Sequence, residues 1–534
     1  MRNFFIKLFF FCLISTRAVA AALPEPVSEA LKRAHIPLSS VSIVVQEAHE
    51  PTPLISLNAE RAMNPASTMK LLTTFAALET LGPAYRWKTE AFLNGKLENG
   101  VLQGDLVFKG YGDPKLTVEQ LWMWLRELRQ RGLREIRGDI VLDHNFFEAV
   151  NQDPAEFDND PTRAYNVGTS ALLLNFNAMH LHLIPNGHET TALLEPELAG
   201  YKLINRITTS AKPHCGGEDA YKAHLDGHNI VLEGSIPAAC GEADDYFSLL
   251  PQDEYFFAVF SALWQELGGT LQGKLRAGTA PADQVPFAKY ISPPLSEVIR
   301  DINKFSNNIM ARQLFLTLGT AEAAKVAAHA DATQAFRSMA AALPADSKDN
   351  IDDASGAPTL SSAPLPVQQD GGDIASAELS VPSTELAGSS VVPPTANIER
   401  STKKMQQWLS AQQLQFPELV LENGSGLSRK ERISAQHLAE ILQHATRSPF
   451  SAELEASLPI LGMDGTVKKR FKDSEIAGYA HLKTGTLEGV KSMAGYVQAH
   501  SGKQWVVVFI ANHPNAALAQ PAQDALIAWL QNGH

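Results

Sequence analysis

Segments with strand character stand near both ends of this chain, and they constrain its fold more than any other feature. They span residues 41–46, 53–57, 492–497 and 504–510. Each is a mostly apolar run of strand length, and polar or glycine-containing turns lie next to it. Helical periodicity dominates other parts of the sequence, notably residues 308–318 and 402–414. We therefore expect an α/β (α+β) fold in which the two ends of the chain share one sheet, with a further region inserted between them.

The first twenty residues have the pattern of a secretory signal peptide. Arg2 and Lys7 precede a short apolar run at residues 8–14, and the small residues Ala18 and Ala20 precede an expected cleavage site. The apolar run is too short to span a bilayer, and no later stretch reaches that length. We therefore expect residues 1–20 to be removed and the mature protein to be exported, soluble and without a transmembrane anchor.

The acidic balance of the chain argues against two classes of partner. Its 534 residues carry a formal net charge of −13, and 45% of them are hydrophobic, which is ordinary for a globular protein with a large core. Because no basic cluster offsets this charge, we expect neither a nucleic acid nor an anionic membrane surface as a partner.

Two of the three cysteines remain once the signal peptide is removed. These are Cys215 and Cys240, and an even pair in an exported protein predicts a disulfide. His214 lies beside Cys215, but a metal site would need a second Cys/His pair at ligand spacing, which the sequence does not offer. We expect no metal and no cofactor.

Strand and turn signals are frequent after residue 88. Residues 92–109 alternate around Asn99-Gly100, which predicts a β-hairpin. Thr117 and Gln120 then resemble a capping box that opens a helix. Short strands and turns follow, with few helices.

These signals divide the chain into parts. Residues 349–399 contain no Lys, Arg or aromatic residue, and Ser, Pro, Ala, Gly and Asp dominate them. Such a segment cannot bury enough apolar surface to offset its ordering entropy, so we expect a disordered low-complexity insertion at residues 345–398. The expected organisation is a discontinuous main domain of residues 23–87 and 285–534, interrupted by one or two β-rich accessory domains at residues 88–284.

A Ser-x-x-Lys motif opens an expected helix over residues 68–81. The i, i+3 spacing of Ser67 and Lys70 places a hydroxyl and an amine on one helix face. A lysine in that position can take the proton of a serine nucleophile. Taken alone, a capping serine and a solvated lysine would explain the same pattern.

Two further motifs follow in a fixed order. Ser306-Asn307-Asn308 joins two expected helices, so that a hydroxyl and a carboxamide can face a cleft from one turn. Lys483-Thr484-Gly485-Thr486 comes just before the strand-forming C-terminal region. The order Ser-x-x-Lys, Ser-x-Asn, Lys-Thr-Gly is the motif set of the penicillin-recognising serine acyl-transferases.

Acyl transfer explains why these residue types are needed. Ser67 attacks a carbonyl, and Lys70 can serve as its base only if it is partly neutral. Burial and the second cation, Lys483, would both lower the pKa of Lys70. Ser306 can relay a proton to the departing amine, while Asn308 holds Lys70 and the substrate amide.

The Lys-Thr-Gly motif suits the other end of the substrate. Lys483 and the hydroxyls of Thr484 and Thr486 are suited to a carboxylate. Gly485 lets an edge strand approach without a side chain in the way. The backbone N–H groups of Ser67 and Thr486 could form an oxyanion hole.

The chain resembles the penicillin-binding protein 4 type of low-molecular-mass class C penicillin-binding proteins. Besides the three motifs, 239 residues separate Ser67 from Ser306 (306 − 67), and this family is marked by a large insertion at that place. The run Gly424-Ser-Gly-Leu-Ser-Arg429 is similar to a loop of the family. The resemblance implies a transpeptidase domain like those of penicillin-binding proteins and β-lactamases, with an antiparallel sheet flanked by helices.

The resemblance also implies an activity and its substrates. It implies a periplasmic serine D-Ala-D-Ala carboxypeptidase and endopeptidase that acts on peptidoglycan stem peptides through an acyl-enzyme on Ser67 and that β-lactams acylate. Asp160 and Arg429 match the family residues that bind the diaminopimelate side chain, with Tyr165 where the family has an aromatic. A turn-capping carboxylate and a surface salt bridge are the alternatives for these two residues. Glu488 stands where a relative carries Gln, so the polarity of that subsite is open.

Two other functions remain to be weighed. A β-lactamase-like hydrolase would need a separate general base for fast deacylation, and the sequence shows no distinct candidate. A penicillin-binding sensor or scaffold would keep the fold without turnover, which the intact Ser67, Lys70, Ser306 and Lys483 disfavour.

Overall fold

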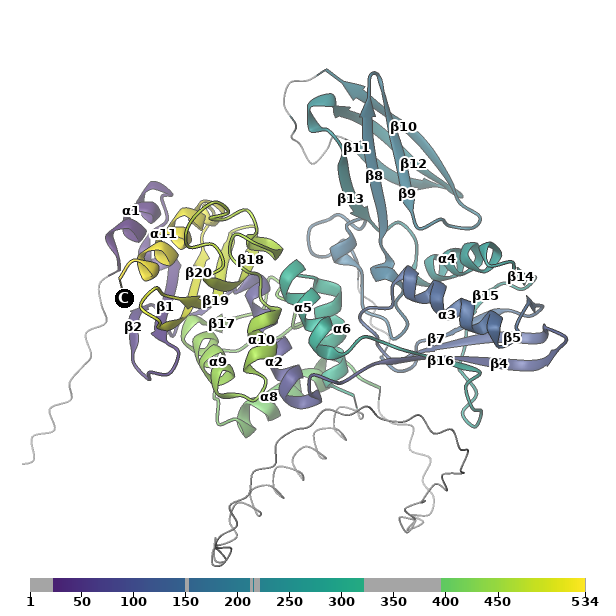
Figure 1. The fold of residues 1–534 in the computed structure, drawn as a ribbon, viewed down its shortest axis with the longest axis horizontal. Helices are drawn as coiled ribbons and strands as arrows, with labels where there is room; N and C mark the ends of the chain where they lie inside the picture. The colour runs from purple at the N-terminus through teal and green to yellow at the C-terminus, as the bar shows by residue number, and fades with distance from the viewer. Residues whose placement is uncertain (1–22, 149–152, 212–214, 216–220, 321–394, 534) are drawn as a thin grey trace, which may run out of the picture. The chain divides into compact units, whose positions relative to one another are not determined.

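The two ends of the chain build one antiparallel sheet, as expected. The structure is a computed structural model that describes residues 23–148, 153–211, 215, 221–320 and 395–533. The strand order in this central sheet is β18-β19-β20-β1-β2. Its members are β1 (Val41–Glu47), β2 (Pro53–Leu57), β18 (Ala480–Leu487), β19 (Val490–Gln498) and β20 (Gln504–Asn512). β1 pairs with β20, so the N-terminal strands join the C-terminal ones directly (Figure 1).

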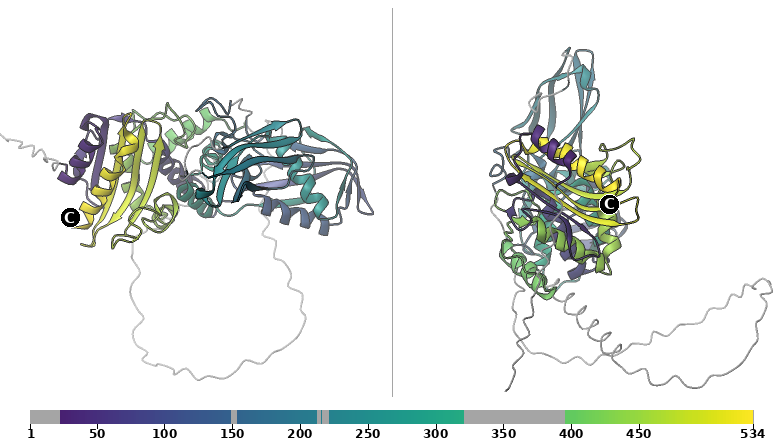
Figure 2. Two further views of the ribbon diagram at one scale, coloured as in Figure 1. Left: turned by 90° about the horizontal axis from the view of Figure 1, so that it is seen from above. Right: turned by 90° about the vertical axis from the view of Figure 1, so that its left-hand side faces the viewer.

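Helices cover both faces of the central sheet. Side chains alternate along each strand, so Val44 and Val508 enter one core while Val45 and Val507 enter the other. One face packs on α1 (Glu25–Arg33) and α11 (Gln520–Gln531), which lie side by side (Figures 1 and 2). The other face packs on a helical layer made of α2 (Lys70–Leu81), α5 (Leu295–Phe305), α6 (Asn308–Leu318), α8 (Ile398–Ala411), α9 (Ala435–Arg447) and α10 (Ser451–Ser457). The sheet is therefore buried on both sides.

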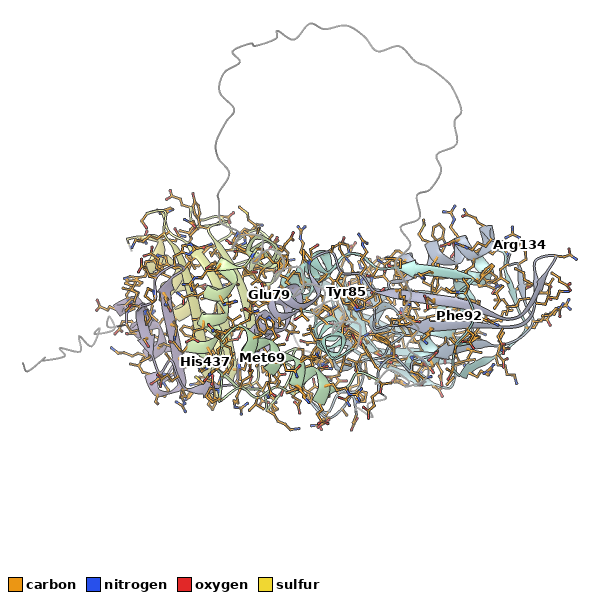
Figure 3. The ribbon with its side chains drawn as sticks, turned by 90° about the horizontal axis from the view of Figure 1, so that it is seen from below. Met69, Glu79, Tyr85, Phe92, Arg134 and His437 are labelled. Carbon is orange, nitrogen blue, oxygen red and sulfur yellow. A yellow bond between two sulfur atoms is a disulfide. The ribbon has the colours of Figure 1, made fainter. Side chains whose placement is uncertain are left out.

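The inserted region builds two further sheets. The chain leaves the first core near Tyr85, and Phe92 and Arg134 already belong to the insert (Figure 3). The expected hairpin around Asn99-Gly100 is present as β4 (Lys88–Glu98) and β5 (Val101–Gly110). These strands lie in a seven-stranded sheet with β6 (Glu135–Ile136), β7 (Ile140–Asp143), β14 (Thr270–Leu271), β15 (Leu275–Ala277) and β16 (Ala288–Ile291). Helices α3 (Val118–Gln130) and α4 (Gln252–Glu266) belong to the same hydrophobic core.

A six-stranded sheet follows within the insert, in the order β11-β12-β10-β9-β8-β13. Its strands are β8 (Met179–Asn186), β9 (Glu189–Glu195), β10 (Lys202–Ser210), β11 (Tyr221–Asp226), β12 (Asn229–Pro237) and β13 (Ala243–Phe247). The expected disulfide joins Cys215 to Cys240, with Cα atoms 4.8 Å apart.

Several boundaries differ from those expected. Ser67 lies in a 3-10 turn, η2 (Ala66–Met69), and α2 begins at Lys70 rather than at residue 68. The sequence also predicts Ser296 as the N-cap of a helix over residues 297–305, but Pro294 occupies the N-cap of α5 and the helix starts at Leu295. The Lys-Thr-Gly motif lies within edge strand β18 and not before a strand, since residues 480–487 pair along β19.

Two predicted segments fall partly or wholly outside the described residues. The expected signal peptide at residues 1–20 lies outside them, as does most of the expected insertion at 345–398. The last residues of that insertion are described: Ala396 pairs with Phe147, and the Asn397 side chain caps α8 by accepting the Arg400 N–H. No helix in the described part of the chain is long and apolar enough to cross a membrane.

Candidate active site

Close contacts with two other segments fix the turn that carries Ser67. Ala66 has a positive φ of 46°, which is unusual for a residue with a side chain. A Cβ on Gly426 would lie 1.9 Å from the carbonyl oxygen of Ala66, and one on Gly485 would lie 2.8 Å from the Ser67 nitrogen. Only glycine allows both approaches, so the loop at 426 and strand β18 hold the serine turn from two sides.

Lys70 lies at the centre of the site and is fully buried. Its Nζ contacts the Ser67 Oγ at 3.0 Å, and it donates to the Asn308 Oδ1 at 2.6 Å and to the carbonyl of Ser425. Burial lowers the pKa of Lys70 well below its ordinary value, and the positive charge of Lys483 lowers it further. A lysine with so low a pKa can be neutral and accept a proton from Ser67.

The turn between α5 and α6 directs two of its three side chains toward Lys70 and Lys483. Ser306 ends α5 in the left-handed conformation, with φ 58°, and Asn308 begins α6. Asn307 turns back, and its carboxamide oxygen caps α6 by accepting the Met310 N–H at 3.0 Å. The capping bond fixes the direction of the turn, which leaves Ser306 and Asn308 on the cleft side.

Lys483 extends from β18 to this turn. Its Nζ donates to the Ser306 Oγ at 2.8 Å and to the Thr484 carbonyl at 2.8 Å. The side chain is fully buried, and burial lowers the pKa of Lys483 to about 7. Ser67 with Lys70 and Ser306 with Lys483 therefore form two hydrogen-bonded pairs, although the four residues come from four different elements.

Glu431 is a site residue that the sequence did not indicate. Its fully buried carboxylate accepts the N–H groups of Asn423, Gly424 and Gly426 at 2.8–2.9 Å, and that of Glu422 at 3.1 Å. These bonds fold residues 422–426 into the loop that presents the Ser425 carbonyl to Lys70. The only signal in the sequence was its position two residues after Arg429 of the family loop, which indicates no such contact.

A cleft of about 690 Å³ opens in front of these groups. Its lining includes Ser67, Ser306, Asn308, Thr484, Thr486, Arg429, Glu488, Asp158 and Tyr165. The Thr484 hydroxyl lies 2.8 Å from that of Thr466, on the loop after α10. Ser67, Ser306, Asn308, Thr484 and Thr486 therefore share one cleft, whereas Lys70 and Lys483 are fully buried.

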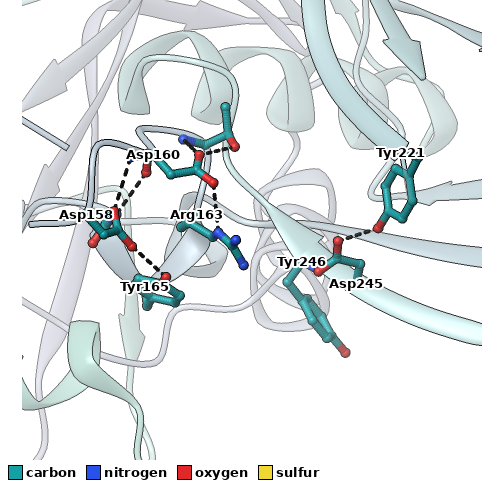
Figure 4. A network of polar contacts seen from close by, with 9 residues as sticks. Asp158, Asp160, Arg163, Tyr165, Tyr221, Asp245 and Tyr246 are labelled. Carbon is teal, nitrogen blue, oxygen red and sulfur yellow. Dashed lines mark hydrogen bonds and ion pairs between the residues drawn. The ribbon is translucent and has the colours of Figure 1, made fainter. Parts of the chain in front are cut away.

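Asp160 and Arg429 are placed differently from each other. Arg429 lines the cleft, where it donates to the Glu488 carbonyl at 3.1 Å and lies over the Phe157 ring at 4.8 Å. Asp160 is not among the lining residues; its carboxylate accepts from Thr162 and from the Arg163 guanidinium at 2.8 Å (Figure 4). Burial alone would raise the pKa of Asp160, but these hydrogen bonds lower it overall.

Asp158 and Tyr165, by contrast with Asp160, line the cleft. Asp158 accepts the Tyr165 hydroxyl at 2.7 Å and the Asn166 amide at 2.7 Å (Figure 4). The loop of residues 153–166 thus contributes Asp158 to the cleft. The residue predicted there, Asp160, lies two positions later in the sequence. Among the described residues, no group of three or more His, Cys, Asp and Glu side chains is placed to hold a metal ion.

The sequence matches a known family over most of the chain. The sequence profile of the D-Ala-D-Ala carboxypeptidase 3 (S13) family matches residues 23–361 and 385–533. The chain belongs to this family. The resemblance predicted from the three motifs is confirmed, and so is the chain's assignment as a peptidase.

Curated relatives and a solved structure resemble the chain over most of its length. D-alanyl-D-alanine carboxypeptidase DacB of Haemophilus influenzae is 22% identical over 481 residues, covering 89% of this chain and 85% of the relative. A D-alanyl-D-alanine carboxypeptidase of Actinomadura sp. is 27% identical over 508 residues, covering 91% of this chain and 80% of the relative. The crystal structure of penicillin binding protein 4 from Haemophilus influenzae has a TM-score of 0.66 at 22% identity, covering 94% of this chain and 99% of that one. The predicted fold class is confirmed.

Proposed function

We propose that this protein is a serine D-Ala-D-Ala carboxypeptidase and DD-endopeptidase of peptidoglycan stem peptides. The observation that carries the proposal is the 3.0 Å contact between the Lys70 Nζ and the Ser67 Oγ, in a buried site that lowers the pKa of the amine. A nucleophile and a base at hydrogen-bond distance are the minimum that acyl transfer requires. The family of the chain supplies the substrate class.

Acylation uses the Ser67–Lys70 and Ser306–Lys483 pairs in its proton transfers. Neutral Lys70 takes the proton of Ser67 as its Oγ bonds to the carbonyl carbon of the penultimate D-Ala. The C–N bond of the scissile amide then breaks, and Ser306, which accepts a hydrogen bond from Lys483, gives its Oγ proton to the leaving amine and takes in return the proton that Lys70 removed from Ser67, so that Lys70 is neutral again. Free D-Ala leaves in the carboxypeptidase reaction, and the amine of a cross-linked stem leaves in the endopeptidase reaction. Water then hydrolyses the ester on Ser67.

The remaining groups bind and orient the substrate. Lys483, Thr484 and Thr486 hold the terminal carboxylate, and the N–H groups of Ser67 and Thr486 stabilise the developing oxyanion. The closeness of Gly485 to the Ser67 nitrogen supports this role, because it places β18 directly beside the serine turn.

Arg429 and the 158–165 loop bind the diaminopimelate side chain. The place of Arg429 in the cleft supports this role, since its guanidinium can bind the carboxylate of the diaminopimelate side chain there. Asp160 can bind the ammonium group of that side chain only when Arg163 releases it, whereas Asp158 already lines the cleft. Glu488 adds an exposed carboxylate beside Arg429.

β-Lactams acylate the same serine in this proposal. A structure of penicillin binding protein 4 from Haemophilus influenzae, 21% identical to this chain, contains a β-lactam. Export by the signal peptide at residues 1–20 would bring the enzyme to the periplasm, where peptidoglycan lies.

Labelling with fluorescent penicillin tests the proposal. We expect one labelled peptide containing Ser67, no label on Ser67→Ala, and release of D-Ala from a pentapeptide by the wild-type protein. Fast β-lactam hydrolysis without D-Ala release would favour a β-lactamase-like hydrolase. Stable labelling without any turnover would favour a penicillin-binding sensor.

A further inference from the structure

The loop of residues 458–466 follows α10 and ends at the catalytic cleft. Its first part runs along β18, the edge strand of the central sheet, and the Leu482 N–H donates to the Pro459 carbonyl at 2.8 Å. Its last residue, Thr466, lines the cleft. The loop therefore contacts β18 just before the Lys-Thr-Gly motif and again reaches the cleft beside that motif.

A buried ion pair ties this loop to α5. Lys304 is only 5% exposed, and its Nζ donates to the Asp464 Oδ2 at 2.6 Å and to the Leu458 carbonyl at 2.9 Å. The other oxygen of Asp464 accepts the Ile460 N–H at 2.7 Å. Burial alone would raise the pKa of Asp464, but these hydrogen bonds lower it overall, so the carboxylate is charged at neutral pH. One carboxylate thus closes the loop on itself and fastens it to the helix.

The backbone of the loop also packs closely on the end of α5. Gly465 has a positive φ of 57°, and a Cβ at this position would lie 2.8 Å from the Lys304 carbonyl oxygen. Glycine allows this approach without displacing the helix. Since Lys304 lies two residues before Ser306, the loop rests on the helix end that carries Ser306.

Thr466 joins this loop to the Lys-Thr-Gly motif. Its hydroxyl oxygen lies 2.8 Å from that of Thr484, and both side chains line the cleft. A threonine hydroxyl has a single proton to donate, whereas its oxygen can accept hydrogen bonds. When Thr484 gives its proton to a substrate carboxylate, its oxygen can only accept from Thr466. Carboxylate binding therefore requires Thr466 to be the donor of this pair.

We propose that Thr466 is a positioning residue for recognition of the carboxylate beside the leaving amine, held in place by the Lys304–Asp464 ion pair. Thr466 donates to the Thr484 Oγ1 and so directs the Thr484 proton toward that carboxylate, where the hydrogen bond is charge-assisted. This role rests on the proposed hydrolysis of D-Ala-D-Ala peptides. It adds to that function the residues that decide how strongly the leaving group must carry a carboxylate.

Two matched thioesters of N-acetyl-D-Ala test the role of Thr466 in the full-length protein. The leaving group is mercaptoacetate in one, with its carboxylate one carbon from the leaving atom as in D-Ala, and neutral mercaptoacetamide in the other. For Thr466→Val we expect kcat/KM to fall about tenfold with mercaptoacetate, mainly through KM, and less than about twofold with mercaptoacetamide. Thr466→Ser keeps the hydroxyl and should restore the wild-type values. Thr466 is exposed, so both variants leave the core intact.

Asp464→Asn tests the ion pair with the same two substrates. The variant removes the charge that pairs with Lys304 but keeps an oxygen for the Ile460 N–H, and we expect a smaller fall that is again selective for mercaptoacetate. Asp473→Asn, at an exposed acid further along the chain, is the matched control and should change neither substrate. A wild-type profile in Asp464→Asn would overturn the role of the ion pair.

The two thioesters also separate this proposal from the proposed function. Equal falls with both substrates in Thr466→Val, or wild-type kcat/KM for mercaptoacetate in that variant, would overturn the role of Thr466 alone. Hydrolysis of neither thioester by the wild-type protein would refute the proposed function and the role of Thr466 with it.

Discussion

The Lys70 Nζ lies 3.0 Å from the Ser67 Oγ and is held there by Asn308 and by the Ser425 carbonyl. The amine is thus fixed on three sides, in a site whose burial lowers its pKa. This arrangement makes Lys70 the base of the proposed reaction and Ser67 its nucleophile. It also makes the activity depend on the loop and on helix α6, which hold the lysine.

Replacing Lys70 tests its role as a base. Lys70→Arg keeps a positive charge but cannot accept a proton, so we expect penicillin acylation to slow by about 10²–10⁴-fold. Stopped-flow measurement of the acylation rate checks this, with Lys32→Arg on the exposed part of α1 as the control. Acylation of Lys70→Arg at the wild-type rate, in protein that melts normally, would assign the base to another group.

The low pKa of Lys483 predicts a pH dependence. A lysine is charged below its pKa, so Lys483 loses its positive charge as the pH rises through about 7. We expect kcat/KM for a peptide ending in D-Ala-D-Ala to fall above that pH, because the cation that holds the terminal carboxylate is lost. A matched thioester substrate without the carboxylate should not show this fall. The same alkaline fall in both substrates would argue against carboxylate binding by Lys483.

Glu431 should matter for stability and for catalysis together. In Glu431→Gln an amide nitrogen replaces one acceptor oxygen and faces backbone N–H groups, so we expect the free energy of unfolding to drop by about 2–4 kcal/mol. Acylation should also slow, since the Ser425 carbonyl loses its fixed position near Lys70. Urea unfolding and penicillin labelling measure the two effects, and Glu453→Gln on the exposed side of α10 is the matched control. Unchanged stability would mean that the loop folds without this carboxylate.

Gly485 tests the close approach of β18 to the serine turn. A Cβ at this position would lie 2.3 Å from the Ser492 Oγ and 2.8 Å from the Ser67 nitrogen. We expect Gly485→Ala to push the strand away and to reduce acylation by about 10²-fold or more. Gly533→Ala, where a Cβ meets open space, serves as the control. Normal acylation by Gly485→Ala would show that the strand need not lie so close.

The segment between the two matched parts of the family profile should be dispensable for acylation. The profile matches residues 23–361 and 385–533, and the sequence predicts disorder across the gap. Deleting residues 362–384 should therefore change the rate of penicillin acylation by less than about twofold. A large loss of rate or of soluble protein would assign a structural role to this segment.

Sequence reasoning identified the central sheet and the residues that meet at the cleft because both leave local signals. Strands with apolar residues at both chain ends predicted that the two ends share one sheet, and in the structure β1 pairs with β20. The order of the three motifs brought Ser67, Ser306 and Lys483 into one prediction, and in the fold Ser67 contacts Lys70 while Ser306 contacts Lys483.

Tertiary contacts decided what the sequence could not show. The 3-10 turn at Ser67 depends on the approach of Gly426 to Ala66 from a loop 360 residues away (426 − 66). Glu431 carries no motif, and its hydrogen bonds exist only once the loop is folded. The ion pair of Asp160 with Arg163 likewise follows from the local turn and not from the spacing to Arg429.

Digestion of purified cross-linked muropeptides, followed by mass spectrometry, tests the central claim most directly. The wild-type protein should remove the terminal D-Ala from pentapeptide stems and should cut the D-Ala–diaminopimelate cross-link, while Ser67→Ala should do neither. Products cut at another bond, or cleavage that persists in Ser67→Ala, would contradict the account.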